Sequence, residues 1–171
     1  MFQLKTISQS GIPRALERAD RYRLLNEPRE AESICRDVLR IDADHQVALR
    51  TMILALTEQF GAGVQVNITH AQELLPRLQS EFDRTYLAGV ICERWAKCQF
   101  RDDAPGNVVY DWFIQAMGWF ERAEPLSEPG DEDARLRWNA CARMIKRYGT
   151  VHPRAEDTVS DDWLQDDVPV R

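Results

Sequence analysis

The chain has 171 residues, of which 44% are hydrophobic and 29% charged, and its formal net charge is −6. This composition is typical of one folded domain and argues against an intrinsically disordered chain. The acidic balance and the lack of a basic run argue against nucleic acid or an anionic membrane surface as partners, and no stretch approaches the ~18 apolar residues of a membrane-spanning helix.

Helical spacing of the apolar residues predicts an all-α protein with about seven helices after a lead-in over residues 1–12. Pro13 and Pro28 suit the first turns of helices, and Asn26 suits a left-handed helix end. Because only about three residues separate the first two helices, they must be antiparallel neighbours. The expected helices cover residues 13–25, 28–41, 45–59, 68–81, 83–100, 108–124 and 132–148.

The helix ends in the middle of the chain are less regular. We expect Asp42–Ala43–Asp44 to cap the third helix and Asn67 or Thr69 to cap the fourth. Pro76 falls inside the fourth helix, where a proline costs about 3 kcal/mol. The fourth helix is therefore either kinked at Pro76 or broken at Leu75.

Aromatic and cysteine residues lie at helical spacing in the second half of the chain. We expect Trp112, Trp119 and Trp138 to pack in the core rather than to line a ligand pocket, and Gly89 to mark a close approach between helices. The four cysteines occur in apolar segments without a C-x-x-C pair, so we interpret them as reduced core residues rather than disulfide or metal ligands. They are Cys35, Cys92, Cys98 and Cys141.

One spacing recurs three times. A small residue, a larger apolar residue four positions on and another apolar or small residue three beyond that occur together, which predicts a repeated helical unit. The three copies are Ala31–Cys35–Val38, Ala71–Leu75–Leu78 and Ala116–Phe120–Ala123.

The first of these units resembles the tetratricopeptide repeat, a pair of antiparallel helices of roughly 34 residues. Ala19 and Tyr22 match its small and aromatic positions in the first helix, while Asn26 stands where glycine is usual. The units cover about residues 12–45, 46–83 and 84–128, with an unpaired terminal helix. The resemblance implies a right-handed superhelical array over residues 13–148 with a concave groove, followed by an acidic tail over 149–171.

In such arrays the first helix of each pair lines the groove. The resemblance therefore implies a non-catalytic scaffold that binds a peptide or protein segment, with cations suited to a carboxylate or an acidic peptide. The alternatives are ordinary solvated charges at these positions, or a self-association module that forms homo-oligomers. The candidate groove residues are Arg23, Arg50, Tyr86, Glu93, Arg94, Asn139, Arg143 and Lys146.

No catalytic or cofactor site can be assembled from the sequence. The three histidines lie in separate segments, and Gly61–Ala62–Gly63 lacks the following lysine of a phosphate-binding loop. We expect no enzyme activity, no metal and no cofactor. The thiols and the absence of a signal peptide in residues 1–10 favour the cytoplasm.

The last segment is the most acidic. Residues 151–171 hold six acidic side chains and two arginines, which gives −4 and leaves −2 for the remaining 150 residues. Asp161–Asp162 and Asp166–Asp167 flank the pair Trp163–Leu164. This segment either docks on the cationic groove of its own or another copy, or is a solubilising tail.

Overall fold

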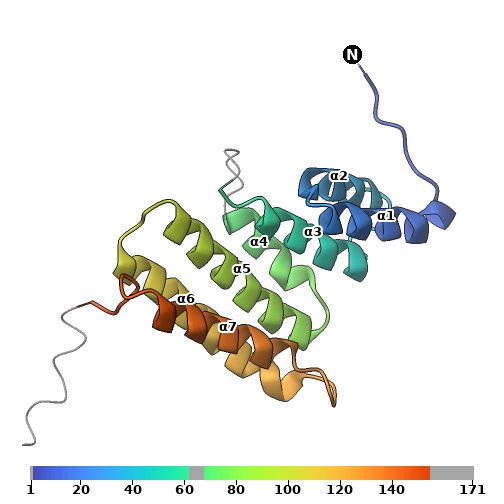
Figure 1. The fold of residues 1–171 in the computed structure, drawn as a ribbon. Coiled ribbons are helices and arrows are strands. Elements are labelled where there is room, and N and C mark those ends of the chain that lie inside the picture. The colour runs from blue at the N-terminus through green and yellow to red at the C-terminus, as the bar shows by residue number, and fades with distance from the viewer. Residues whose placement is uncertain (1, 62–67, 155–171) are drawn as a thin grey trace, which may run out of the picture.

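A computed structural model of the chain describes residues 2–61 and 68–154. These residues form seven α-helices, three short 3₁₀ turns and no strand, as the apolar spacing predicts (Figure 1). The α-helices are α1 (Ile12–Leu24), α2 (Pro28–Leu39), α3 (Gln46–Glu58), α4 (Ile68–Leu74), α5 (Glu81–Arg101), α6 (Gly106–Ala123) and α7 (Asp133–Arg147).

Each helix packs on the next one in the chain, and alternate helices also meet. Helix α3 contacts both α1 and α5, while α2 and α4 each pack against the helices before and after them. In Figure 1, α1, α3, α5 and α7 run in a similar direction, and α6 returns between α5 and α7. The long α5–α6 pair has the most extensive contact in the fold, and α7 covers its outer side.

Left-handed backbone conformations follow α1 and α3. Asn26 has φ 60° and Gly61 has φ 80°, so both adopt the left-handed conformation expected at a helix end. The cap of α3 differs from the prediction: the His45 ring, not an aspartate, accepts a hydrogen bond of 3.3 Å from the Ala48 N–H. The Asp42 carboxylate instead accepts from the Asp44 N–H within the preceding turn.

The fourth helix is short. Helix α4 ends at Leu74 and a 3₁₀ turn follows over Leu75–Arg77, which confirms the break rather than the kink. Pro76 lies in that turn, where its missing N–H and fixed φ are compatible with the backbone. Thr69 lies within α4, and Asn67, the other expected cap, is outside the described residues.

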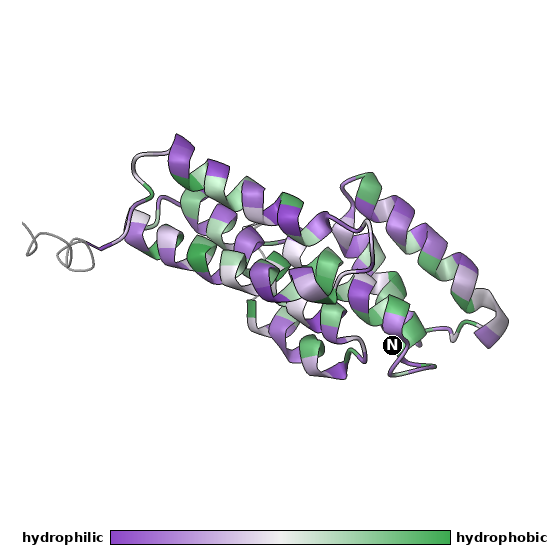
Figure 2. Cartoon of the chain, turned by 90° about the horizontal axis from the view of Figure 1, so that it is seen from below, coloured by the Kyte–Doolittle hydropathy of each residue, from purple (hydrophilic) through white to green (hydrophobic). Residues whose placement is uncertain are grey.

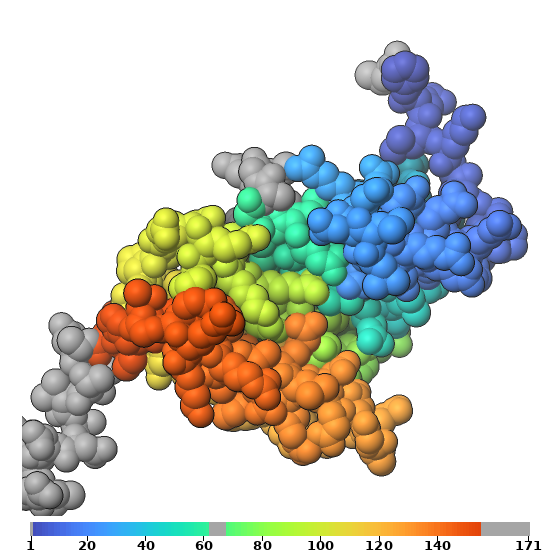
Figure 3. All heavy atoms as spheres, in the orientation of Figure 1, coloured from blue at the N-terminus to red at the C-terminus, as the bar shows by residue number. Residues whose placement is uncertain are grey.

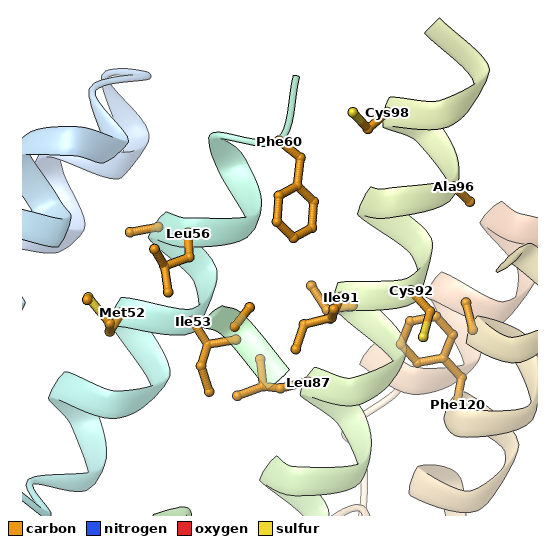
Figure 4. Packing of buried hydrophobic residues seen from close by; sticks show 14 of the residues in the cluster. Met52, Ile53, Leu56, Phe60, Leu87, Ile91, Cys92, Ala96, Cys98 and Phe120 are labelled. Atoms are coloured by element: carbon orange, nitrogen blue, oxygen red, sulfur yellow. The ribbon is translucent and has the colours of Figure 1, made fainter. Parts of the chain in front are cut away.

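The core is centred on α5, which packs against α3 and α6. Figure 4 shows Ile53 of α3 directed toward Leu87 and Ile91 of α5, with Phe120 of α6 on the other side of α5. Hydrophobic residues form stripes along the helices, and hydrophilic residues occupy much of the rest (Figure 2). This is the pattern expected of amphipathic helices that share one core.

Gly89 allows α5 and α6 to approach closely. A Cβ atom at this position would lie 2.6 Å from the Phe120 ring, well inside contact distance.

All four cysteines are free and buried, as expected. Trp112, Trp119 and Trp138 pack against the core and are partly buried. Trp138 donates to the Glu121 carboxylate, and Trp119 lies beneath the Arg122 guanidinium. Among the described residues, no helix combines the length and the apolar character needed to cross a membrane.

Candidate interaction face

Charged side chains from alternate helices meet along one side of the molecule. We call this set the charged face. It joins α1, α3 and α5, which are the first helices of the predicted pairs, and α7, the predicted terminal helix. Its members are Asp20 and Arg23 of α1, Glu58 of α3, Glu93, Arg94 and Lys97 of α5, and Arg137 of α7.

The carboxylate of Glu58 lies between two arginines. Arg23 donates to it from Nη2 at 2.8 Å and from Nε at 3.2 Å, which is a bidentate arrangement. Arg94 Nη1 lies 3.4 Å from the same carboxylate and also donates to the Thr57 hydroxyl at 2.6 Å and to the Leu54 carbonyl at 3.0 Å. These bonds fix both guanidinium groups in place and tie α1 and α5 to α3.

Glu93 forms the second centre of the charged face. It is only 1% exposed, and its carboxylate accepts bonds from Lys97 Nζ at 2.5 Å and from Arg137 Nη1 at 2.7 Å. Arg137 Nε also donates to the Tyr86 hydroxyl at 2.8 Å. Because a buried carboxylate needs such partners, Arg137 fixes α7 against α5.

Burial and neighbouring charge shift the pKa values of this set in different directions. Burial lowers the pKa of Arg94, and the Glu58 carboxylate offsets part of that effect. Burial also lowers the pKa of Arg137, but the charge of Glu93 and the bonds to Glu93 and Tyr86 outweigh it, so the pKa is raised. Burial raises the pKa of Tyr86, against the opposing effect of Arg137. Both arginines stay charged at neutral pH, because an arginine pKa is far above 7.

The charged face carries more positive than negative groups. Its four cations exceed its three carboxylates by one charge. The exposed fraction of the side chain is 43% for Lys97 and 29% for Arg137, against 2% for Glu93. Asp20 is 52% exposed, so groups of both signs meet solvent, and the solvent-exposed cations are chiefly Lys97 and Arg137.

The surface of α5 is accessible between its neighbours. Figure 3 shows the green to yellow atoms of α5 between the orange-red atoms of α7 and the blue and teal atoms of α1 to α3. A cleft of about 550 Å³ adjoins this region, bordered by Glu58 of the charged face and by Arg101 at the end of α5, together with Arg29 and Phe60.

Four predicted groove residues belong to this arrangement or touch it. Arg23, Glu93 and Arg94 are members of the charged face, and Tyr86 binds Arg137. Arg50 lies apart, 3.4 Å from the Asp83 carboxylate, in a separate cleft of about 380 Å³ near the start of α5. The role of all five in binding a partner stays a prediction.

The other three candidates lie elsewhere on α7. Asn139, Arg143 and Lys146 follow Arg137 by two, six and nine residues, which places them roughly 180–240° around the helix from it. Arg143 and Lys146 are exposed and form no ion pair within residues 2–61 and 68–154. Burial of Cys141 sets this rotation, so Arg137 is the α7 residue that faces α5.

Sequence reasoning left out two members of the charged face that interact with Glu93. Lys97 had a local signal, because a glutamate and a lysine four residues apart on a helix form an ion pair. Arg137 had none, because its contact with Glu93 depends on how α7 is rotated in the fold.

No group of three or more His, Cys, Asp or Glu side chains in the described part of the chain is placed to hold a metal ion. In comparisons with known proteins, the chain matches no family model, no curated protein and no solved structure.

Proposed function

We propose that this protein is a non-catalytic scaffold with a tetratricopeptide-like array of helix pairs, and that its charged face binds an acidic segment of a partner protein. The packing order supports the array: consecutive helices pack together, and α3 contacts both α1 and α5. The observation that carries the binding proposal is the cluster of four cations, with an excess of one positive charge, on a face that four helices build together.

Two carboxylates of the charged face, Glu58 and Glu93, prepare the cations for a ligand. Glu58 and Glu93 hold the Arg23, Arg94 and Arg137 guanidinium groups in fixed orientations, so less side-chain entropy is lost when a ligand binds. Guanidinium groups have more N–H donors than these bonds use, and carboxylates are their preferred acceptors. An extended segment with several Asp or Glu residues has the matching chemistry.

A random-peptide display library tests the chemistry of the ligand. The library is panned on the full-length chain and, in parallel, on a full-length variant in which Asp161, Asp162, Asp166 and Asp167 are replaced by Asn. We expect the selected peptides to be enriched in Asp and Glu and to lose binding at high salt. Selection of basic or purely apolar peptides by both chains, or of none, would contradict the proposal.

The second candidate function is self-association, which one observation favours. Phe2 is 103% exposed and Leu4 is 75% exposed, in a segment that precedes the first helix. Contiguous exposed apolar surface is typical of association sites, and these two side chains lie only two residues apart. Sedimentation velocity over a range of protein concentrations tests this, with the Phe2→Ser, Leu4→Ser double variant as the control. A sedimentation coefficient that rises with concentration only in the wild type would favour self-association.

A further inference from the structure

We propose that residues 155–171 bind to the charged face of their own chain and compete there with partner segments. The binding portion is Asp161–Asp162–Trp163–Leu164–Gln165–Asp166–Asp167. This inference rests on the proposed function, because it assigns an internal occupant to the same face.

Charge is the first argument. Residues 155–171 contain six carboxylate side chains and one arginine, Arg171, so this segment carries a net charge of −5. The charged face holds four cations and carries an excess of one positive charge. Opposite charge favours the encounter, and Trp163–Leu164 adds an apolar anchor between the acidic pairs.

Chain length is the second argument. The chain after α7 is fixed next to α6: Val151 is 4% exposed, and a Cβ atom at Gly106 would lie 1.7 Å from the Thr150 carbonyl oxygen. From Arg154, an extended chain spans roughly 23 Å to Asp161 and roughly 43 Å to Asp167. Arg137 lies about 15 Å along α7 from Arg147, and Arg147 lies at most roughly 23 Å from Arg154, so Arg137 is within roughly 38 Å of Arg154. The acidic segment is therefore long enough to reach the charged face.

Attachment to the same chain makes this segment an effective competitor. A segment joined through a short linker is present at an effective concentration in the millimolar range. A partner segment of similar affinity must exceed that concentration to displace it. Partners with higher affinity, or with more acidic residues, are thereby selected.

Lysine positions allow a direct test. Lysine occurs at only three positions, on three different surfaces: Lys5 before α1, Lys97 on the charged face and Lys146 on the far side of α7. A carbodiimide couples a lysine amine to a carboxylate that touches it, with loss of water. Glu93, the carboxylate that already pairs with Lys97, is 2% exposed and is therefore poorly accessible to the reagent.

The experiment treats the full-length protein with carbodiimide and identifies the coupled peptides by mass spectrometry. We expect amide links from Lys97 to Asp161, Asp162, Asp166 or Asp167 and few from Lys146. The links should disappear in a Lys97→Arg variant, which keeps the charge but has no amine. A mixture of ¹⁵N-labelled and unlabelled protein separates links within one chain from links between copies.

Three results would overturn the inference: acidic-segment links mainly to Lys146 or Lys5, links only between labelled and unlabelled copies, or no links to this segment at all. Failure of the proposed function is a separate outcome. If the Asn-substituted chain selects acidic peptides but Lys97 forms no link to residues 155–171, the face binds partners without an internal competitor. If that chain selects no acidic peptide, the proposed function itself fails.

Discussion

The guanidinium of Arg137 in α7 donates a hydrogen bond of 2.7 Å to the carboxylate of Glu93 in α5, 44 residues earlier in the chain. Glu93 is almost completely buried, whereas Arg137 retains 29% of its side-chain exposure. This contact places α7 on α5 and completes the charged face. It also makes Glu93 dependent on its partners, because a buried carboxylate without them is strongly destabilising.

Replacement of Arg137 by Met should therefore lower the free energy of unfolding by about 3 kcal/mol, at the low end of the range for breaking a buried ion pair, because Lys97 still pairs with Glu93. Urea denaturation measures this. The matched control is Arg135→Met, since Arg135 pairs with Glu124 and Glu132 at the surface and should change stability little. Adding Glu93→Gln to Arg137→Met should recover part of the loss; a fully additive pair would contradict the coupling.

Gly89 and Gly118 provide a pair of alanine substitutions with opposite expected signs. Gly89→Ala places a methyl group 2.6 Å from the Phe120 ring and should destabilise the protein by about 1–3 kcal/mol. Gly118 lies in α6 with nothing within 4 Å of its added Cβ, so Gly118→Ala should stabilise the protein by about 0.5–1 kcal/mol. Equal effects in thermal denaturation would contradict the close α5–α6 contact.

Asn26 adopts φ 60° in the turn between α1 and α2. This conformation costs ordinary residues about 1–2 kcal/mol and costs glycine little. Asn26→Ala should therefore lower the melting temperature and Asn26→Gly should preserve or raise it. If the two variants have the same melting temperature, the left-handed conformation of residue 26 is not what ends α1.

Buried thiols make stability depend on alkaline pH. Burial raises the pKa of Cys35 to about 12, that of Cys92 to about 11 and that of Cys141 to about 12, from an ordinary value of 9.0. Above pH 9 the unfolded chain loses these protons while the folded chain keeps them. The stabilising contribution is therefore complete below pH 9 and is lost between pH 9 and about 12.

The free energy of unfolding should accordingly fall as the pH rises from 9 to 11, by as much as about 1.4 kcal/mol per pH unit for each thiol. Urea denaturation at several pH values measures the slope. A Cys35→Ala variant should show a shallower slope than the wild type, whatever its stability at neutral pH. The same slope in both would mean that other groups cause the dependence.

Local sequence signals predicted most of the helices. Pro28, Asn26 and Gly61 determine the backbone at helix ends through their own conformational limits, so they could be read without knowledge of the fold. Pro76 left open whether the fourth helix is kinked or broken, and in the structure the helix ends before Leu75. His45 was missed as a cap because its role depends on the backbone angles of the turn, for which aspartate is the commoner residue.

The charged face was only partly predictable. Arg23 and Arg94 were identified from helix periodicity and the assumed repeat, and they do meet at Glu58. The α7 candidates Asn139, Arg143 and Lys146 do not lie with that set, because the rotation of a terminal helix is set by distant packing, and their role in binding stays a prediction. Arg143 and Lys146 point away from α5, while Arg137 faces it.

The affinity for an acidic peptide in matched lysine variants is the most direct test of the charged face. Full-length Lys97→Gln and Lys146→Gln lose the same charge, but only Lys97 lies on that face. Fluorescence anisotropy with a labelled Asp-rich twelve-residue peptide compares them in the background with Asn at positions 161, 162, 166 and 167. Lys97→Gln should weaken binding roughly fivefold and Lys146→Gln should leave it unchanged. Equal affinity in both variants, or a larger loss in Lys146→Gln, would contradict the account.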